Sequence, residues 1–299
     1  MGTLGSYVYT LDNAGNRQGV TEADGSSITW GMDDAYHLLS ETRKNSAGQQ
    51  TSQVNFTYDP MGNRQTKQVV GQTTSTTNFS YNALDQLTDA GSTHYTYDGR
   101  GNLTQMTASG QNINYSFNAA DQMTGVNFPT GPGLSYQYDA SGHRVQQVNA
   151  GVTTNYLWDE ESAFGDVVAE TNQSGAVQAN YIYGRNELLT QVRGATTSYY
   201  LHDGQGSVRA LTNISGTVTD RYSYEAFGVL ASKQGSTTNA YLYTGQQFDA
   251  TTGLYSLRAR MYNPGSARFF SRDTAQVDPQ HPDVLDGYLY TSSNPTYVA

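Results

Sequence analysis

Cysteine is absent from this 299-residue chain, and lysine occurs only three times, as Lys44, Lys67 and Lys233. The lack of cysteine excludes disulfides, thiolate zinc sites and cysteine nucleophiles, while it leaves the redox compartment open. The 16 basic residues stand against 26 acidic ones, which gives a formal net charge of -10. Because such a chain has no basic face for phosphates, we expect no nucleic-acid partner.

Long apolar runs are missing as well. No stretch comes near the roughly 18 consecutive apolar residues that a membrane helix needs, so no membrane span is predicted. Residues 1–7 contain neither the charged nor the apolar region of a signal peptide. If the protein is exported, a signal outside this chain must direct it.

The abundant residues are those of β proteins. The chain contains 24 Tyr and 31 Gly, whereas charged residues make up only 14% of it. Tyr and Thr suit the half-buried surface of a sheet, and Gly and Asn suit the turns between strands. Since Ala, Leu, Glu and Lys do not dominate, a helical bundle is excluded.

An aromatic-x-aromatic pair recurs along the chain at intervals of 16 to 25 residues. Asp or Asn follows the pair, then a short turn with Gly or Asn, and then Arg, Leu or Met. Clear copies begin at Tyr7, Phe56, Tyr95 and Tyr136. The residues that define the units in these copies are Tyr9, Tyr58, Asp59, Gly62, Asn63, Tyr97, Asp98, Gly101, Asn102, Tyr138, Asp139 and Gly142.

Each unit is predicted to be a β-hairpin. Alternating aromatics place both rings on one face of a strand, and the Asp with the following Gly and Asn reverses the chain. A hairpin alone is marginally stable, so the units must pair into one continuous sheet, which twists and curls. A membrane barrel is excluded because segments such as residues 73–78 lack a lipid-facing apolar residue at every second position.

These units resemble the YD repeats of the RHS family, and the C-terminal third resembles the RHS-associated core. The core resemblance rests on residues 199–209, on residues 222–228 and above all on residues 248–273. It implies an all-β fold, in which a curled, cocoon-like sheet of hairpins over residues 1–195 ends in a core plug over residues 196–299. In bacterial polymorphic toxins and the C component of Tc toxins, such a shell encloses a toxin.

The resemblance also implies a self-cleaving aspartic peptidase in the plug, where two carboxylates share one proton. The first catalytic Asp falls on Asp273 and its assisting Arg on Arg260. The second Asp should follow the stretch that reads Asn294 to Ala299 here, so we expect this polypeptide to be unable to cleave itself. Thr274, Ala267 and Asn263 also depart from the pattern. On the residues alone, Arg260 and Asp273 are an ion pair in a turn-rich plug.

Other candidate sites are weaker. Asp278, Asp283 and Asp286 could replace the missing carboxylate, but we expect them to be solvated capping residues of a Pro-rich loop. The five histidines lack metal-ligand spacing, and His143 takes the Asn position of a turn. No metal and no cofactor are therefore predicted.

Two functions remain open, and we favour the first. The first is a segment of a toxin shell that is covalently linked to a C-terminal effector and is secreted or exposed on a bacterial surface. The second is a surface adhesion module whose Tyr rows stack on glycans. Roughly 24 strands at ~4.8 Å spacing span only ~115 Å. We therefore expect an open spiral, or part of a larger shell whose remaining wall lies upstream or in a partner subunit, and the native start stays open.

Overall fold

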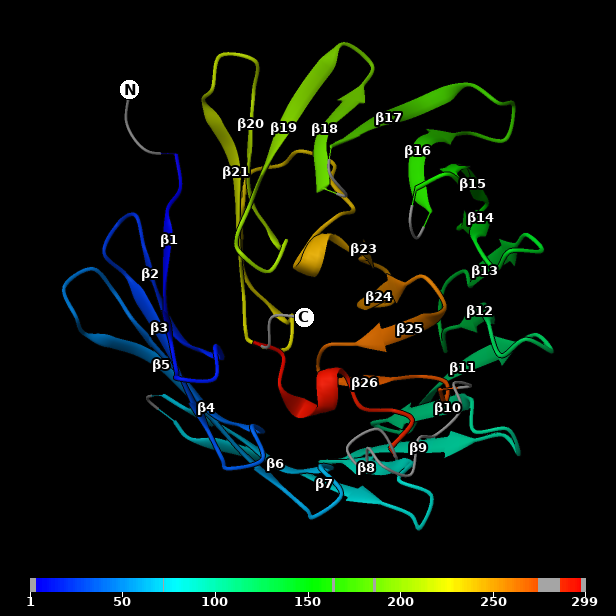
Figure 1. Ribbon diagram of the computed structural model, residues 1–299. Helices are drawn as coiled ribbons and strands as arrows, with labels where there is room; N and C mark the ends of the chain where they lie inside the picture. The colour runs from blue at the N-terminus through cyan, green and yellow to red at the C-terminus, as the bar shows by residue number, and fades with distance from the viewer. Residues whose placement is uncertain (1–3, 72, 163–164, 185–186, 274–285, 297–299) are drawn as a thin grey trace.

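The fold consists of two antiparallel sheets, one curled around the other (Figure 1). The structure is a computed structural model that describes residues 4–71, 73–162, 165–184, 187–273 and 286–296. A 22-stranded sheet, here called the wall, surrounds a 4-stranded sheet, here called the plug. The prediction of an all-β chain with a continuous curled sheet and a core plug is confirmed.

The wall comprises strands β1 to β22. Their bounds are β1 Tyr7–Leu11, β2 Arg17–Glu22, β3 Ser27–Met32, β4 Leu38–Lys44, β5 Gln50–Tyr58, β6 Arg64–Val70, β7 Ser75–Tyr81, β8 Leu87–Ala90, β9 Thr93–Tyr97, β10 Leu103–Ala108, β11 Gln111–Phe117, β12 Met123–Asn127, β13 Leu134–Tyr138, β14 Arg144–Asn149, β15 Val152–Asp159, β16 Asp166–Thr171, β17 Val177–Gly184, β18 Glu187–Arg193, β19 Thr196–His202, β20 Val208–Thr212, β21 Val218–Tyr224 and β22 Leu230–Gln234. The plug comprises β23 Gln247–Asp249, β24 Leu254–Leu257, β25 Arg260–Asn263 and β26 Arg268–Phe269, with short 3₁₀ turns η1 Tyr243–Gly245 and η3 Thr291–Ser293. None of the helices among the described residues has the length and apolar character needed to span a bilayer.

The wall is built from neighbours in sequence. Each strand pairs antiparallel with the next, and in the described ladder β1 pairs with β2 and β22 with β21, so the sheet stays open. The first hairpin nevertheless contacts the turn between β19 and β20 through side chains. Arg17 donates to the Gly204 carbonyl at 2.6 Å, and the Gly204 N–H donates to the Tyr9 hydroxyl at 3.0 Å. The two ends of the wall thus meet without a backbone ladder.

The turn between β5 and β6 shows how a unit reverses the chain. The Asp59 carboxylate accepts hydrogen bonds from the N–H groups of Met61 and Asn63, both at 2.9 Å. The Asn63 side-chain amide donates to the other Asp59 oxygen at 3.1 Å. Gly62 lies at φ +83°, a left-handed conformation in which glycine is strained least. The turns that begin at Asp12 and Asp98 repeat the same contacts.

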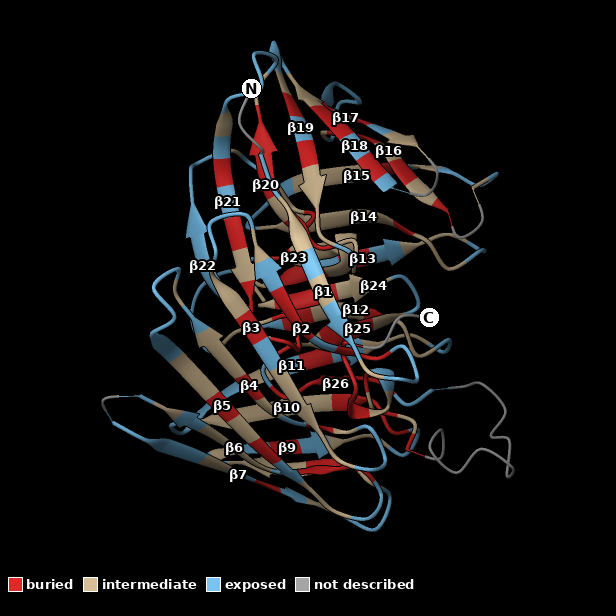
Figure 2. Ribbon diagram, turned by 60° about the vertical axis from the view of Figure 1, so that its left-hand side comes forward, coloured by how far each residue is buried: buried red, intermediate tan, exposed pale blue. Residues whose placement is uncertain are grey.

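The paired aromatic side chains of the repeat units face inward. Tyr136, Tyr156 and Tyr181 are buried, whereas residues between the paired aromatics, such as Leu157 and Ile182, are exposed on the outside. Figure 2 shows buried residues concentrated along the wall strands and on the plug inside their curve. This in-out alternation is what a strand period of two requires when one face packs on a core.

The second aromatic of a unit also joins it to the preceding hairpin. The Tyr58 hydroxyl donates to the Leu38 carbonyl at 2.8 Å, and the Tyr138 hydroxyl donates to the Met123 carbonyl at 2.7 Å. Tyr81, Trp158 and Tyr224 make the same contact with the first residue of β6, β14 and β20, respectively. These backward hydrogen bonds add a side-chain link to the ladder between hairpins.

Buried tyrosines of the plug and its flanking turn fix the plug to the wall. Tyr255 and Tyr262 donate hydrogen bonds to the carbonyls after β21, and Tyr243 does the same from η1. From the wall side, the Tyr136 hydroxyl donates to the Asp249 carboxylate at 3.0 Å. The wall continues through Gln234, so the expected division at residues 195 and 196 lies between two of its paired strands, β18 and β19.

Candidate functional site

Arg260 and Asp273 lie together at the edge of the plug. Arg260 opens β25, and Asp273 follows β26, where its N–H donates to the Gly287 carbonyl at 2.8 Å. Arg260 Nη2 lies 2.7 Å from Asp273 Oδ2, and Arg260 Nη1 donates to the same Gly287 carbonyl at 3.0 Å. One guanidinium therefore holds both the side chain of Asp273 and the segment that pairs with its backbone.

Arg260 and Asp273 differ in how far they are buried. The Arg260 guanidinium lies over the Phe269 ring at 3.7 Å, and its burial lowers the pKa of Arg260 despite the attraction of Asp273. The Asp273 side chain is 42% exposed, against 22% for Arg260. The arginine is thus anchored in the plug, while the carboxylate is accessible from outside it.

A cavity of about 380 Å³ lies beside the pair. Residues 120–122 and 141–143 of the wall and residues 258–260 and 271–273 of the plug line it. Its volume falls within the range of small-molecule and peptide side-chain pockets. Asp273 therefore meets the first requirement of a catalytic carboxylate, which is access to a space where a substrate segment and water can sit.

Asp286 is a correction to the sequence analysis, which expected it to be solvated. Its side chain is fully buried, and both carboxylate oxygens accept from Arg268 Nη2 at 3.0 Å. Burial raises the pKa of Asp286, and the charge of Arg268 opposes that rise. Asp286 is buried because the end of its loop lies between the plug and the wall. Asp286 is engaged with Arg268, and Asp278 and Asp283 lie outside the described residues.

Arg268 connects the plug to two hairpin turns, a contact that sequence reasoning missed. Its Nη1 donates to Asn63 Oδ1 at 2.8 Å, and its Nη2 donates to the Asp85 carbonyl. The same Asn63 amide also donates to the Asp85 carboxylate at 2.8 Å. The only signal in the sequence is that Arg268 lies in the core motif, and nothing local there indicates which wall turn it meets.

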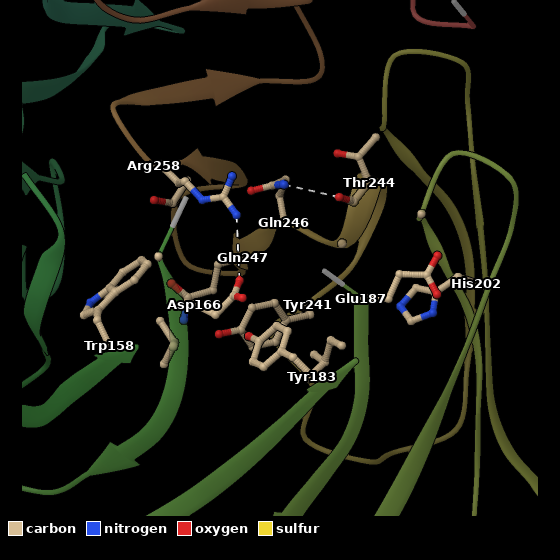
Figure 3. Close-up of a pocket in the computed structure, with 16 residues that line it drawn as sticks. Trp158, Asp166, Tyr183, Glu187, His202, Tyr241, Thr244, Gln246, Gln247 and Arg258 are labelled. Atoms are coloured by element: carbon tan, nitrogen blue, oxygen red, sulfur yellow. Dashed lines mark hydrogen bonds and ion pairs between the residues drawn. The ribbon is translucent and has the colours of Figure 1, made fainter. Parts of the chain in front are cut away.

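A second cavity lies between the wall and the inner segment that carries the plug (Figure 3). It has a volume of about 120 Å³, which is room for several water molecules. Asp166 of β16 and Arg258 of the plug face each other across it at 3.8 Å. His202 lines the far side, and burial lowers the pKa of its imidazole. Its size and polar lining fit a hydrated seam between two layers better than a substrate site.

The repeat residues predicted from the sequence lie in wall turns and strands, and two units come close to the Arg260 and Asp273 pair. Gly101 packs near Arg272, and Asn102 donates to the Asp121 carboxylate at 2.7 Å beside the cavity. Asp139 and Gly142 belong to the turn between β13 and β14, and Gly142 lines the 380 Å³ cavity. The position expected to precede the second catalytic Asp falls on residues 297–299, which lie outside the described residues.

Comparison with known proteins gives one family and several relatives. The profile of the family described as Teneurin YD-shell matches residues 16–296. The chain is 32% identical over 252 residues to the tRNA3(Ser)-specific nuclease WapA of Bacillus spizizenii and 31% identical over 252 residues to the tRNA nuclease WapA of Bacillus subtilis. Each match covers 81% of this chain and 10% of the relative, so the chain spans about a tenth of the length of these proteins.

Among solved structures, the crystal structure of TcdB2-TccC3 is similar in fold. The match covers 97% of this chain and 19% of that one, with a TM-score of 0.50 and 16% sequence identity. At that identity the likeness concerns the path of the backbone alone, namely a curled wall of hairpins with a segment folded inside it.

Proposed function

The chain belongs to the teneurin YD-shell family, and we propose that it forms part of the wall and the plug of a shell enclosing a toxic effector that is linked to its C-terminal side. On this proposal the protein is secreted or displayed by a bacterium. The remaining wall is supplied by an upstream segment or by a partner subunit, because the open sheet described here is short.

The observation that carries the proposal is the plug folded inside the wall. A chain that served only as an extended adhesive surface would have no need to turn its C-terminal strands inward. Here the wall tyrosine Tyr136 bonds Asp249 of the plug, and Arg268 of the plug bonds Asn63 of the wall. The relatives named above are tRNA nucleases, and this chain matches only a tenth of their length, so most of each nuclease lies outside the matched segment. This supports an effector outside the segment described here.

Self-cleavage is the second part of the proposal. Asp273 borders a cavity that a peptide segment can enter, and Arg260 fixes the orientation of its carboxylate. With a second carboxylate from the following residues, water adds to the scissile carbonyl while one carboxylate accepts its proton. The other carboxylate then protonates the leaving amine, so that the peptide bond is hydrolysed.

Intact mass spectrometry of the natural gene product, including the residues that follow Ala299, tests the cleavage. We expect the wild type to give two fragments and Asp273→Asn to stay whole. Asp34→Asn, which changes an exposed aspartate of a turn, serves as the matched control and should split as the wild type does. Equal cleavage in wild type and Asp273→Asn would overturn the role of Asp273.

A protease-protection experiment tests the container independently of cleavage. The native gene product is treated with a non-specific protease, and survival of the segment after Ala299 is compared with survival of the same segment expressed alone. We expect the enclosed segment to last markedly longer. If both are degraded at the same rate, the enclosure proposal is wrong, whatever the outcome of the cleavage experiment.

The adhesion alternative has less support in the structure. Sugar stacking needs exposed aromatic faces, whereas Tyr95, Tyr115 and Tyr136 of the repeats are buried. Binding of the chain to a glycan array with dissociation constants in the micromolar range would restore that alternative.

A further inference from the structure

A histidine and two carboxylates converge at the tips of two neighbouring hairpins. Asp139 and His143 belong to the turn between β13 and β14, and Glu160 belongs to the turn between β15 and β16. One ligand atom from each of the three side chains lies within 4.8 Å of the other two. From this arrangement we propose a binding site for a divalent transition-metal ion such as Zn²⁺, which nothing in the family resemblance assigns.

The His143 turn departs from its counterparts in a way that favours a metal. In the turns of Asp59 and Asp98, an asparagine amide donates to the second aspartate oxygen at 3.1 Å. His37, which takes the same position in another turn, contacts Asp33 Oδ2 through Nδ1 at 2.9 Å. In contrast, His143 Nδ1 lies 3.3 Å from Asp139 Oδ2, and among the described residues this buried nitrogen has no hydrogen-bond partner.

The imidazole of His143 is held in place before any ion binds. Its ring stacks on Trp158, with centroids 4.6 Å apart and planes 16° from parallel. On the Nε2 edge the backbone of Gly165 approaches so closely that an added Cβ would lie 2.7 Å from Nε2. Gly165 therefore flanks the Nε2 edge, whereas Nδ1 lies beside Asp139, and on the proposal Nδ1 is the nitrogen that coordinates the ion.

The geometry suits a small borderline cation. Ligand atoms about 2.1 Å from a shared tetrahedral ion lie roughly 3.4 Å apart, close to the present separation of His143 Nδ1 and Asp139 Oδ2. Glu160 is exposed, so its side chain can close the remaining gap by rotation. One imidazole with two carboxylates suits Zn²⁺ or a similar first-row ion, with water in the remaining position.

No motif in the sequence indicates this site, because its ligands come from two hairpins and not from one continuous stretch. In the fold, the ion would connect two turns that otherwise meet through side-chain packing. His143 also lines the 380 Å³ cavity beside Arg260 and Asp273, so the metal would stabilise the wall edge of that cavity. The inference does not depend on the proposed peptidase.

Isothermal titration of the untagged chain with Zn²⁺ tests the site. We expect one ion per chain, and we expect His143→Asn and Glu160→Gln to weaken binding at least about tenfold, because even loss of an outer-sphere partner costs roughly 10–100-fold. His143→Asn installs the residue that other turns carry, and Glu160 is exposed, so both variants should fold. His37→Asn and Glu161→Gln are the matched controls and should bind as the wild type does.

A second readout locates the ion. Co²⁺ bound at His143 should quench the fluorescence of the stacked Trp158. This quenching should disappear in Trp158→Phe and should need at least about tenfold more Co²⁺ in Glu160→Gln. The proposal is wrong if the wild type binds no Zn²⁺ at millimolar concentration. It is equally wrong if His143→Asn and Glu160→Gln bind Zn²⁺ as tightly as the wild type, or if Co²⁺ leaves Trp158 fluorescence unchanged.

Discussion

Replacement of Arg268 by methionine probes the junction between plug and wall. Arg268 is buried, and its guanidinium contacts Asn63, the Asp85 carbonyl and both oxygens of Asp286. Methionine has a similar reach and is apolar, so Arg268→Met removes these contacts without opening a large cavity. The substitution leaves the fully buried Asp286 carboxylate without its cationic partner.

The expected destabilisation follows from that unpaired carboxylate. Removal of one partner of a buried ion pair costs about 3–5 kcal/mol, since the remaining charge is uncompensated. An unfolding entropy of ~2.1 cal/mol/K per residue amounts to ~0.6 kcal/mol/K for a chain of this length, so Tm should fall by about 5–8 °C. Arg100→Met breaks a partly exposed pair with Asp121 and two exposed hydrogen bonds to the carbonyls of Asn118 and Ala119. It should cost only about 1 kcal/mol, because water can replace these contacts.

Urea unfolding followed by circular dichroism measures the loss, and pH gives an internal check. Burial raises the pKa of Asp286 even with Arg268 present, and loss of Arg268 raises it further. A carboxyl whose folded pKa is raised binds its proton more readily in the folded state, so the deficit of Arg268→Met should shrink as the pH falls towards ~4. The double variant Arg268→Met with Asp286→Asn should recover part of the lost stability.

Two results would refute this reasoning. One is an unfolding free energy of Arg268→Met within about 1 kcal/mol of the wild type, which would mean that the buried pair contributes no more than a surface pair. The other is a double variant less stable than Arg268→Met, which would mean that the unpaired charge of Asp286 is not the cause of the loss.

Three further predictions concern the wall. Tyr138→Phe should lower the free energy of unfolding in urea by about 1–2 kcal/mol, because the Met123 carbonyl loses the hydrogen bond from the Tyr138 hydroxyl. Tyr199→Phe on the outer face should cost under about 0.5 kcal/mol. Gly62→Ala should destabilise the chain by about 1 kcal/mol more than Gly15→Ala. Both glycines have positive φ, but an added Cβ at Gly62 would lie 3.2 Å from Leu289 and 3.4 Å from His37, whereas one at Gly15 would meet nothing within 4 Å, so equal losses would contradict this contact. Burial raises the pKa of Tyr58 to about 12, so between pH ~10 and ~12 the folded state keeps a proton that the unfolded state loses. The free energy of unfolding should therefore be full below pH ~10 and decline as the pH rises towards ~12. A near-UV titration in which all tyrosines ionise near pH ~10 would contradict this.

The hairpins were predictable because their causes are local. Alternation of aromatic and polar residues determines which side chains face inward, and Asp59 with Gly62 determines where the chain turns. These interactions join residues within a few positions of each other, so they can be inferred from the order of residues alone. Because each hairpin is defined locally, the sequence predicts a continuous sheet that curls. The exact number of strands was predicted only approximately.

The contacts between plug and wall were not predictable. Arg268 and Asn63 are 205 residues apart in sequence, and their pairing depends on how far the wall curls before the chain turns inward. Asp286 was misjudged for the same reason, since a loop residue is buried only if another layer covers it. The Asp139, His143 and Glu160 cluster likewise needs two hairpins in register, which no single motif encodes.

The backward direction of the aromatic hydrogen bonds has a consequence for biosynthesis. Tyr58 bonds Leu38, and Tyr138 bonds Met123, so each of these contacts uses a carbonyl that has already left the ribosome when the tyrosine emerges. Each new hairpin can dock on its predecessor at once, and a growing wall exposes only one unfinished edge at a time. The plug strands are translated after all the wall strands, so the plug folds against hairpins that have already emerged.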